Sequence, residues 1–176
     1  NDEVAIGYPT TPEVIYGFGI SSSYKNFDLS FFFQGSLNSS FFIDAYNTSP
    51  FIDTSGGAIG NNALLSAWAN DHWSENDRNL YAAWPRLSDQ LIDNNNRNST
   101  WWLRDGSFLR LKSIEFGYSV SDKLASKVNL SSARIYVTGT NLLTFSKFKL
   151  WDVEMGGNGL GYPIQQSANI GINLNF

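Results

Sequence analysis

The last nine residues of the sequence alternate without exception between apolar and polar side chains. Apolar or small residues occupy the even positions and amides or glycine the odd ones (Ala168, Ile170, Ile172, Leu174, Phe176; Asn169, Gly171, Asn173, Asn175). A period of two residues predicts a β-strand with two different faces. No charged residue follows Glu154, although the water-facing side of a sheet normally carries charge. The segment therefore suits a membrane strand with lipid outside and a wet lumen inside, or the last strand of a soluble sandwich, which alternates in the same way.

Composition narrows the classes of protein to which the chain can belong. Charged residues make up 16% of the 176 residues, aromatic residues 15%, and asparagine alone occurs nineteen times. The net charge of −4 provides no basic surface for nucleic acid. Without cysteine, disulfides and thiolate metal sites are excluded. No apolar run approaches the roughly 18 residues of a spanning helix, so a membrane crossing would have to be made by strands.

Five segments have strand character, at residues 15–24, 27–35, 103–120, 133–140 and 166–176. In 103–120 the apolar side chains move from odd positions to even ones without a turn. This change predicts either a β-bulge near Lys112 and Ser113 or a half-strand that faces something other than lipid. We expect an all-β chain, folded as an antiparallel meander of about five strands.

The connections between these segments alternate between short and long. The first is the dipeptide Lys25-Asn26, and the second is the long stretch 36–101, which has no period, contains Gly56-Gly57 and has helical character only at 63–70. A polar connection of about twelve residues follows, and then a glycine-rich loop at 141–165. Short turns on one side and long loops on the other are typical of bacterial outer-membrane barrels. Because the smallest such barrels use about eight strands, the missing strands are expected elsewhere.

Six short motifs in a fixed order resemble the C-terminal segment of the SusC/RagA-like TonB-dependent transporters. They span nearly the whole chain, except for the long stretch 36–101, which matches only in being long and variable (Tyr16-Gly17-Phe18, Tyr24-Lys25-Asn26-Phe27-Asp28-Leu29-Ser30, Asp105-Gly106-Ser107-Phe108-Leu109-Arg110-Leu111-Lys112, Gly117-Tyr118, Gly139-Thr140-Asn141-Leu142-Leu143, Gly171-Ile172-Asn173-Leu174-Asn175-Phe176). One departure is Asp152-Val153-Glu154, where the family commonly has Asp-Pro-Glu, so we expect a different local turn there.

The resemblance implies the fold and the role of a larger protein. It implies a 22-stranded transmembrane β-barrel in the outer membrane of a Gram-negative bacterium, of which residues 1–176 form the C-terminal portion with long extracellular loops. It implies import of oligosaccharides or peptides together with a SusD-like lipoprotein, driven by the TonB complex. The plug and the segment that contacts TonB are expected N-terminal to this chain, and the start at Asn1, which lacks a signal-peptide pattern, fits a removed signal or an interior piece of a longer protein.

Six tryptophans fall in the segments expected outside the membrane or at its rim. Their ring faces suit sugar rings and apolar peptide side chains, although loop packing and interfacial anchoring use tryptophan in the same way. Some of them could equally face a lipoprotein lid. The candidates for substrate or lid contact are Trp68, Trp73, Trp84, Trp101, Trp102 and Trp151.

No pattern predicts an enzyme, a metal or a cofactor. His72, the single histidine, lies beside Asp71, but no Gly-x-Ser-x-Gly elbow accompanies it. Asp89 with Asp93, and Asp152 with Glu154, lack the spacing of a calcium loop. The run at 156–161 lacks the lysine and hydroxyl residue of a phosphate-binding loop, so we expect a flexible loop. The competing hypothesis is a soluble β-rich module that binds glycans through its tryptophans.

Overall fold

The computed structural model describes residues 3–51 and 63–176. The chain divides into two compact units. The sheet unit contains residues 9–39, 106–147 and 164–176, and the loop unit contains residues 1–8, 40–105 and 148–163. The Gly56-Gly57 pair of the long connection lies outside the described residues. No described helix is long and apolar enough to cross a bilayer.

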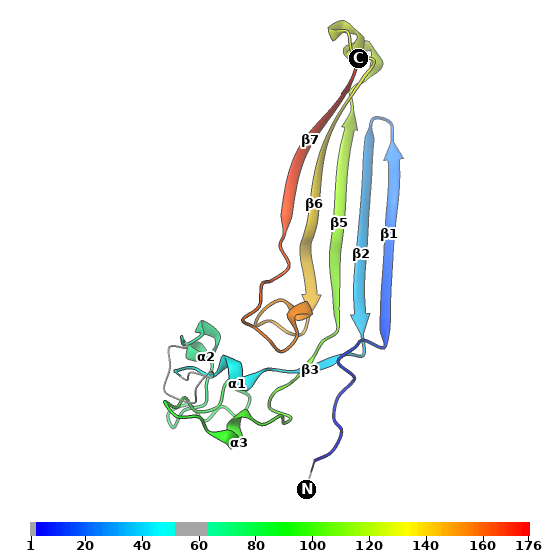
Figure 1. Cartoon of the computed structure of the whole chain (residues 1–176). Coiled ribbons are helices and arrows are strands. Elements are labelled where there is room, and N and C mark those ends of the chain that lie inside the picture. The colour runs from blue at the N-terminus through cyan, green and yellow to red at the C-terminus, as the bar shows by residue number, and fades with distance from the viewer. Residues whose placement is uncertain (1–2, 52–62) are drawn as a thin grey trace. The chain divides into compact units, whose positions relative to one another are not determined.

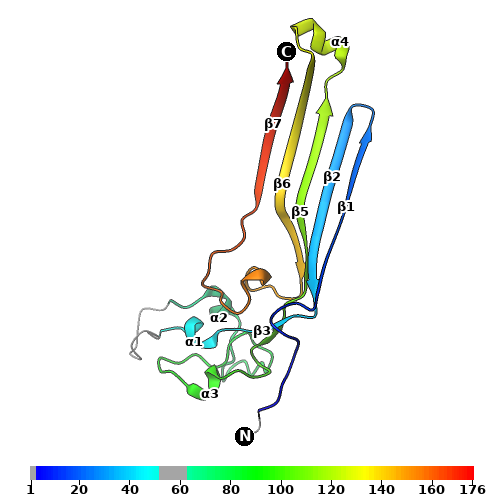
Figure 2. The same ribbon diagram turned by 45° about the vertical axis from the view of Figure 1, so that its right-hand side comes forward.

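The sheet unit is one five-stranded antiparallel sheet (Figures 1 and 2). Its strands follow one another in chain order, each paired with the next, so the predicted antiparallel meander is confirmed. Two short helices, α4 (Asp122–Ala125) and η1 (Ser126–Val128), connect the third strand to the fourth. The strands are β1 (Val14–Tyr24), β2 (Phe27–Leu37), β5 (Phe108–Ser119), β6 (Ser132–Ser146) and β7 (Ser167–Asn175).

A tight turn at Lys25-Asn26 joins β1 to β2, as the sequence predicts. Lys25 has φ +54°, in the left-handed region, which a two-residue hairpin turn commonly needs because it matches the twist of the strands. The Asn26 side chain then donates to the carbonyl oxygen of Ser119 at 2.7 Å. The turn is thereby tied to the end of β5, which keeps three strands in register.

The predicted bulge is present at Lys112. The pairing of β5 with β2 shifts between Phe32 and Phe33, and its pairing with β6 shifts between Leu111 and Ser113. One extra residue in a strand moves all following side chains by one position. Leu109 and Leu111 therefore lie on the same face as the apolar residues of the other half of β5.

Two strand boundaries differ from the predicted ones. Residues 103–105 form a separate strand, β4 (Leu103–Asp105), paired with β3 (Ser40–Phe42) in the loop unit, so the segment 103–120 is not one strand. β6 continues to Ser146 instead of ending at 140. Asn141, at φ +54°, breaks the strict alternation that the prediction followed, but Leu143 and Phe145 resume it and pair with β5.

The loop unit consists of short elements around an aromatic core. It contains the β3–β4 pair, α1 (Ala45–Thr48), α2 (Ser66–Asn70), α3 (Asp93–Asn96) and η2 (Val153–Met155). The helix expected at 63–70 begins only at Ser66. The buried apolar side chains of this unit are Phe41, Ile43, Ala45, Trp68, Ala82, Ala83, Trp84, Trp102, Phe148 and Val153.

Candidate functional site: a two-faced sheet and a tryptophan-centred loop unit

One face of the sheet is apolar across all five strands, and we call it the apolar face. Strand register places Phe18 beside Phe33, Leu29 beside Phe116, and Val137 beside Ile170. Aromatic pairs stack along it, including Phe18 with Phe33 at 5.3 Å between ring centroids. The apolar face comprises Phe18, Ile20, Phe27, Leu29, Phe31, Phe33, Ile114, Phe116, Tyr118, Ile135, Val137, Ile170, Ile172 and Leu174.

Most of these side chains are exposed where a soluble sheet would cover them. Ile170, Ile172 and Leu174 keep 78%, 61% and 49% of their surface exposed. A contiguous exposed apolar surface of this kind marks contact with a membrane or with another protein layer. Within the part of the chain that the structure describes, no second sheet or helix covers this row of β7.

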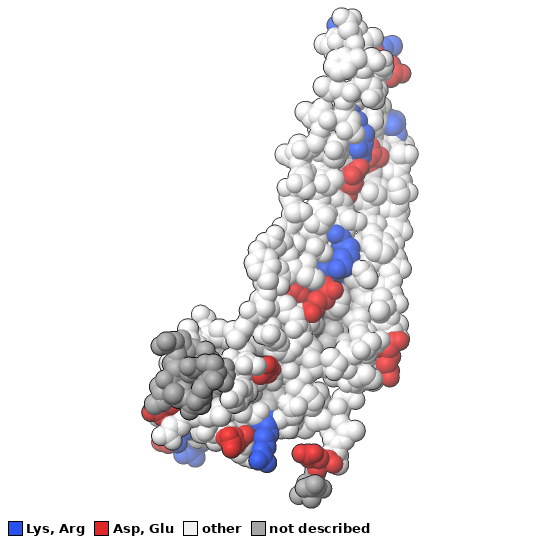
Figure 3. Space-filling view, in the orientation of Figure 1, with Lys and Arg blue, Asp and Glu red and all other residues white. Residues whose placement is uncertain are grey.

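The opposite face, which we call the polar face, holds four of the five charged residues of the five strands. Lys112, at the bulge, is the fifth. Figure 3 shows acidic and basic side chains gathered along the middle strands. The remaining residues of the polar face are mostly small or amide side chains, among them Ser21, Ser23, Ser30, Thr138, Asn169, Asn173 and Asn175.

A three-strand ion cluster lies on the polar face. Arg134 on β6 donates through Nε to Asp28 on β2 at 3.0 Å, and its Nη2 bonds both Asp28 and Glu115 of β5, the latter at 2.6 Å. The guanidinium reaches β2 by crossing over β5 at Gly117. A Cβ atom at this glycine would collide with Nη2 of Arg134 and would lie 2.5 Å from the carboxylate oxygens of Asp28. A fork-shaped guanidinium suits two carboxylates at once, so the cluster fixes the register of three strands.

A tyrosine ring covers the next glycine along the same face. Tyr136 lies over Gly171 of β7, and the guanidinium carbon of Arg134 lies 5.0 Å from the centroid of the Tyr136 ring. A ring laid over a strand glycine replaces the packing that the missing side chain would supply. The sequence showed the glycines and the charges, but only the register reveals that they belong to one constellation.

Three buried tryptophans form the centre of the loop unit. Trp68, Trp84 and Trp102 are 0%, 4% and 1% exposed, and the Trp84 ring lies 4.8 Å from that of Trp68 and 4.9 Å from that of Trp102. Buried indole N–H groups need acceptors. The Trp68 N–H donates to the carbonyl of Thr48 at 3.2 Å, and the Trp102 N–H donates to that of Asn95 at 2.8 Å.

The glycine-rich segment joins this core instead of being a simple flexible loop. Trp151 packs edge-on against Trp68 with 6.1 Å between centroids, and its N–H donates to the carbonyl of Gly156 at 2.8 Å. A Cβ atom at Gly159 would meet the Trp151 ring at 2.7 Å, and one at Gly157 would collide with the carbonyl oxygen of Phe42. Glycine at these positions allows close packing, so residues 148–163 share one core with the described residues of the segments 40–51 and 63–105.

The six candidate tryptophans therefore differ in what their side chains do. Trp68, Trp84 and Trp102 are enclosed in the core of the loop unit, whereas Trp73, Trp101 and Trp151 are half-buried and keep some exposed surface. Contact of any of them with substrate or with a lid stays a prediction. It now applies to Trp73, Trp101 and Trp151, because only these three keep exposed surface.

His72 has a structural position at the end of α2. Its Nδ1 lies 3.0 Å from the carbonyl oxygen of Trp68 and 3.1 Å from that of Ala69. A hydrogen bond from the ring to these carbonyls caps the helix. Among the described residues, no three His, Cys, Asp or Glu side chains lie close enough together to hold a metal ion.

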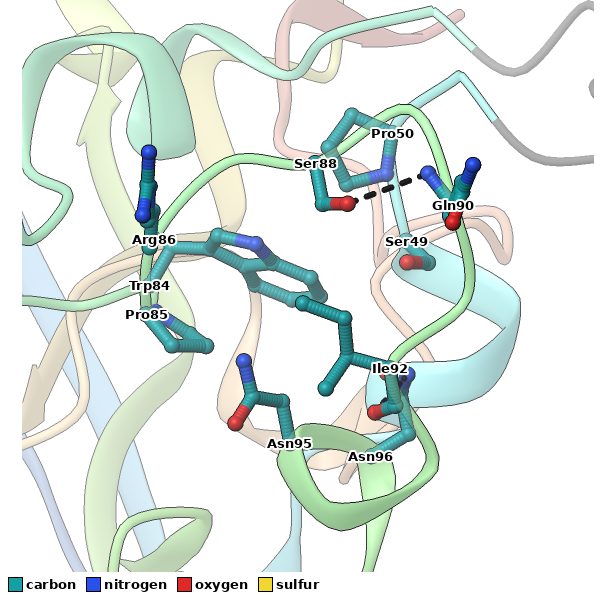
Figure 4. Close-up of a pocket in the computed structure, with 10 residues that line it drawn as sticks. All are labelled: Ser49, Pro50, Trp84, Pro85, Arg86, Ser88, Gln90, Ile92, Asn95 and Asn96. Carbon is teal, nitrogen blue, oxygen red and sulfur yellow. Dashed lines mark hydrogen bonds between the residues drawn. The ribbon is translucent and has the colours of Figure 1, made fainter.

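Among the described residues of the loop unit, two hollows bear on a binding site. The one in Figure 4, into which the Trp84 indole and Ile92 point, has a cavity volume of only about 10 Å³, room for about one water molecule. The other is a cleft of about 1250 Å³ lined by Asn94, Asn95 and the segment 97–102, with Glu3, Val4, Ile6, Phe42 and Pro85. Nothing in the local sequence pattern of this segment predicts the cleft.

Arg104 fixes the backbone beside the cleft. Its Nη1 donates to the carbonyls of Trp101 at 2.6 Å and Leu103 at 2.9 Å. Burial lowers the pKa of Arg104 from its ordinary value, but an arginine stays charged at neutral pH. The charge-assisted bonds hold Trp101 in place.

Comparison with known proteins gives consistent relatives in sequence and structure, although no family model matches the chain. It is 30% identical, over its whole length, to TonB-dependent receptor P26 of Formosa agariphila and 28% identical, over 93% of its length, to TonB-dependent receptor SusC of Bacteroides thetaiotaomicron. The solved structure of the RagAB peptide transporter superposes on 97% of the chain with a TM-score of 0.68 and 26% identity.

These matches cover only part of the larger proteins. The chain spans 18% of receptor P26, 15% of SusC and 18% of the matched RagAB chain. Within that share, both the sequence and the antiparallel sheet agree with the family that the six motifs predict. The chain is thus SusC/RagA-like and corresponds to a segment of TonB-dependent receptors.

Proposed function

We propose that residues 1–176 form the C-terminal part of a TonB-dependent active transporter in the outer membrane of a Gram-negative bacterium. The transporter imports oligosaccharides or peptides together with a SusD-like lipoprotein. The sheet unit is a section of the barrel wall, and the loop unit forms part of the extracellular surface. The relatives are receptors and transporters, and we propose no catalytic role.

The observation that carries this proposal is the separation of the two faces of the sheet. The apolar face extends over five strands with its side chains exposed, and the ion cluster lies on the opposite face. A barrel wall needs hydrocarbon-compatible residues outside and tolerates charge toward an aqueous lumen. A soluble sandwich would instead bury the apolar face beneath a second layer.

Strand length and open edges support the same assignment. The five strands are 9 to 15 residues long, and a tilted membrane strand needs about 9–11 residues. Among the described strands, β1 and β7 each pair on one side only. Because unpaired strand edges are not tolerated in lipid, the remaining strands of the transporter would pair with these edges, and its plug would lie against the polar face.

The connections at the two ends of the sheet support its orientation. The β1–β2 turn and the short α4–η1 connection lie at one end of the meander, and the long connections 40–105 and 148–163 follow β2 and β6, which end at the other. Because outer-membrane barrels have short periplasmic turns and long outer loops, this pattern supports an extracellular loop unit. There it would meet the substrate and the proposed lipoprotein.

Uptake by living cells tests the proposal. Deletion of the gene should abolish uptake of a labelled oligosaccharide or peptide on which the host grows, and the full-length gene should restore it. A version with residues 63–101 replaced by a short glycine-serine linker should reach the outer membrane but lose uptake and co-purification of the lipoprotein. Unchanged uptake and unchanged co-purification would argue against the role of the loop unit.

The soluble glycan-binding module is the remaining rival. This hypothesis predicts that the chain stays monomeric in buffer without detergent, because a soluble module would have to fold with the residues of the apolar face covered. Our proposal predicts aggregation of the isolated chain, and analytical ultracentrifugation with and without detergent separates the two.

A further inference from the structure

Three asparagines that line the large cleft of the loop unit have side chains without another partner among the described residues. The side-chain amides of Asn94, Asn95 and Asn98 make no hydrogen bond to any described residue. Each amide offers a donor and an acceptor side by side. The cleft therefore contains three free sets of hydrogen-bonding groups, next to the hydroxyls of Ser99 and Thr100.

The lining of the cleft carries one acidic and one basic residue, so its net charge is zero. Glu3 and Arg97 are the only charged residues in its lining, and they form no ion pair with each other or with another described residue. A site for a strongly charged ligand would present an excess of one sign. The cleft is suited to an uncharged ligand that is rich in polar groups.

Trp101 adds a ring and an unsatisfied donor to the same wall. Its side chain is half-buried, and the indole N–H is buried without an acceptor among the described residues. A buried donor without a partner destabilises the folded state, because it has lost its hydrogen bond to water. Movement of this ring toward an incoming hydroxyl group would relieve that cost.

The wall also disfavours recognition of a peptide by strand addition. That mode requires an exposed strand edge, and Phe42 is the only residue of the cleft lining that lies in a strand. A sugar chain does not need such an edge, because each ring brings its own hydroxyl groups and an apolar face for an aromatic side chain.

We propose that this cleft is a binding site for a neutral oligosaccharide, held by the amides of Asn94, Asn95 and Asn98 and in contact with the ring of Trp101. The inference rests on the proposed transport function and narrows its two substrate classes to one. The cleft contributes initial capture at the extracellular surface.

Calorimetry on the full-length transporter in detergent tests the site. The probes are neutral hexasaccharides built from glucose, xylose, mannose or galactose, and the uncharged hexapeptide (Gly-Ser)3 as the peptide probe. At least one hexasaccharide should bind. Asn98→Ala should weaken its binding about fivefold to tenfold, the loss of one hydrogen bond, and Asn94→Ala combined with Asn98→Ala should weaken it further. Trp101→Phe keeps the ring face and removes the N–H, and should have a smaller effect than Asn98→Ala.

The matched control is Asn76→Ala, an exposed asparagine of the loop unit outside the cleft, which should bind as the wild type does. Unchanged affinity in the Asn94/Asn98 double variant would overturn the site while leaving transport intact. Binding of (Gly-Ser)3 but of no hexasaccharide would overturn the ligand class. If no probe binds although cells still take up labelled substrate, the cleft proposal fails and the transport proposal stands.

Discussion

Replacement of Trp68 by alanine tests whether the loop unit has a core of its own. Trp68 is fully buried, contacts the rings of Trp84 and Trp151, and donates to the carbonyl of Thr48. Large aromatic-to-alanine changes in cores cost about 3–5 kcal/mol. Each 1.4 kcal/mol is a factor of ten in an equilibrium constant, so local opening of the loop unit should become about a hundredfold more frequent or more.

Hydrogen exchange measured by mass spectrometry on the full-length protein gives the readout. In Trp68→Ala, amides in 63–105 and 148–163 should exchange at least about a hundredfold faster, because both segments share the core, while β1, β2 and β7 keep their protection. The control is Trp73→Ala, since Trp73 is half-buried and makes no ring contact with a described aromatic residue. Faster exchange in 63–105 with unchanged exchange in 148–163 would refute the shared core.

Three further changes test individual contacts. Gly171→Val should displace the ring of Tyr136 that covers it and impair barrel assembly, read from the heat-dependent shift in gel mobility, whereas wild-type mobility would show that the ring gives way freely. Arg134→Met leaves two carboxylates without their shared guanidinium, so the melting temperature should fall at neutral pH and partly recover when Asp28→Asn is added; no recovery would disprove charge repulsion as the cause. His72→Ala removes only a helix cap and should leave uptake unchanged, and loss of uptake would point to a catalytic or ligand-binding role.

The sheet could be predicted from sequence because its strands obey a simple rule. Alternation depends only on which side of the sheet a residue faces. β7 was therefore evident from Ile170, Ile172 and their neighbours, and most of β1 was evident from its own alternating residues. The change of parity between Leu111 and Ile114 likewise predicted either a bulge or a half-strand with a different environment, since one extra residue is needed to keep the apolar side chains of both halves on one face. The rule failed at Asn141, where a left-handed residue interrupts a strand that continues.

The loop unit could not be predicted because its contacts join residues distant in sequence. Trp68, Trp84 and Trp151 meet only after two connections have folded together, and nothing in their local spacing indicates which of them is buried. The ion cluster had the same difficulty, because Asp28 and Arg134 are 106 residues apart and come together through strand register.

The most direct test of the central claim is to measure what surrounds the two faces of β7 in a bilayer. The chain has no cysteine, so single cysteines can be introduced at Ile172 and Asn173 of the full-length protein, once any cysteines elsewhere in it are replaced, and labelled with nitroxide. We predict that the label at 172 is accessible to oxygen, which concentrates in lipid, and that the label at 173 is not. Equal accessibility of both labels to a water-soluble nickel complex, with neither favoured by oxygen, would contradict the assignment of the apolar face to lipid.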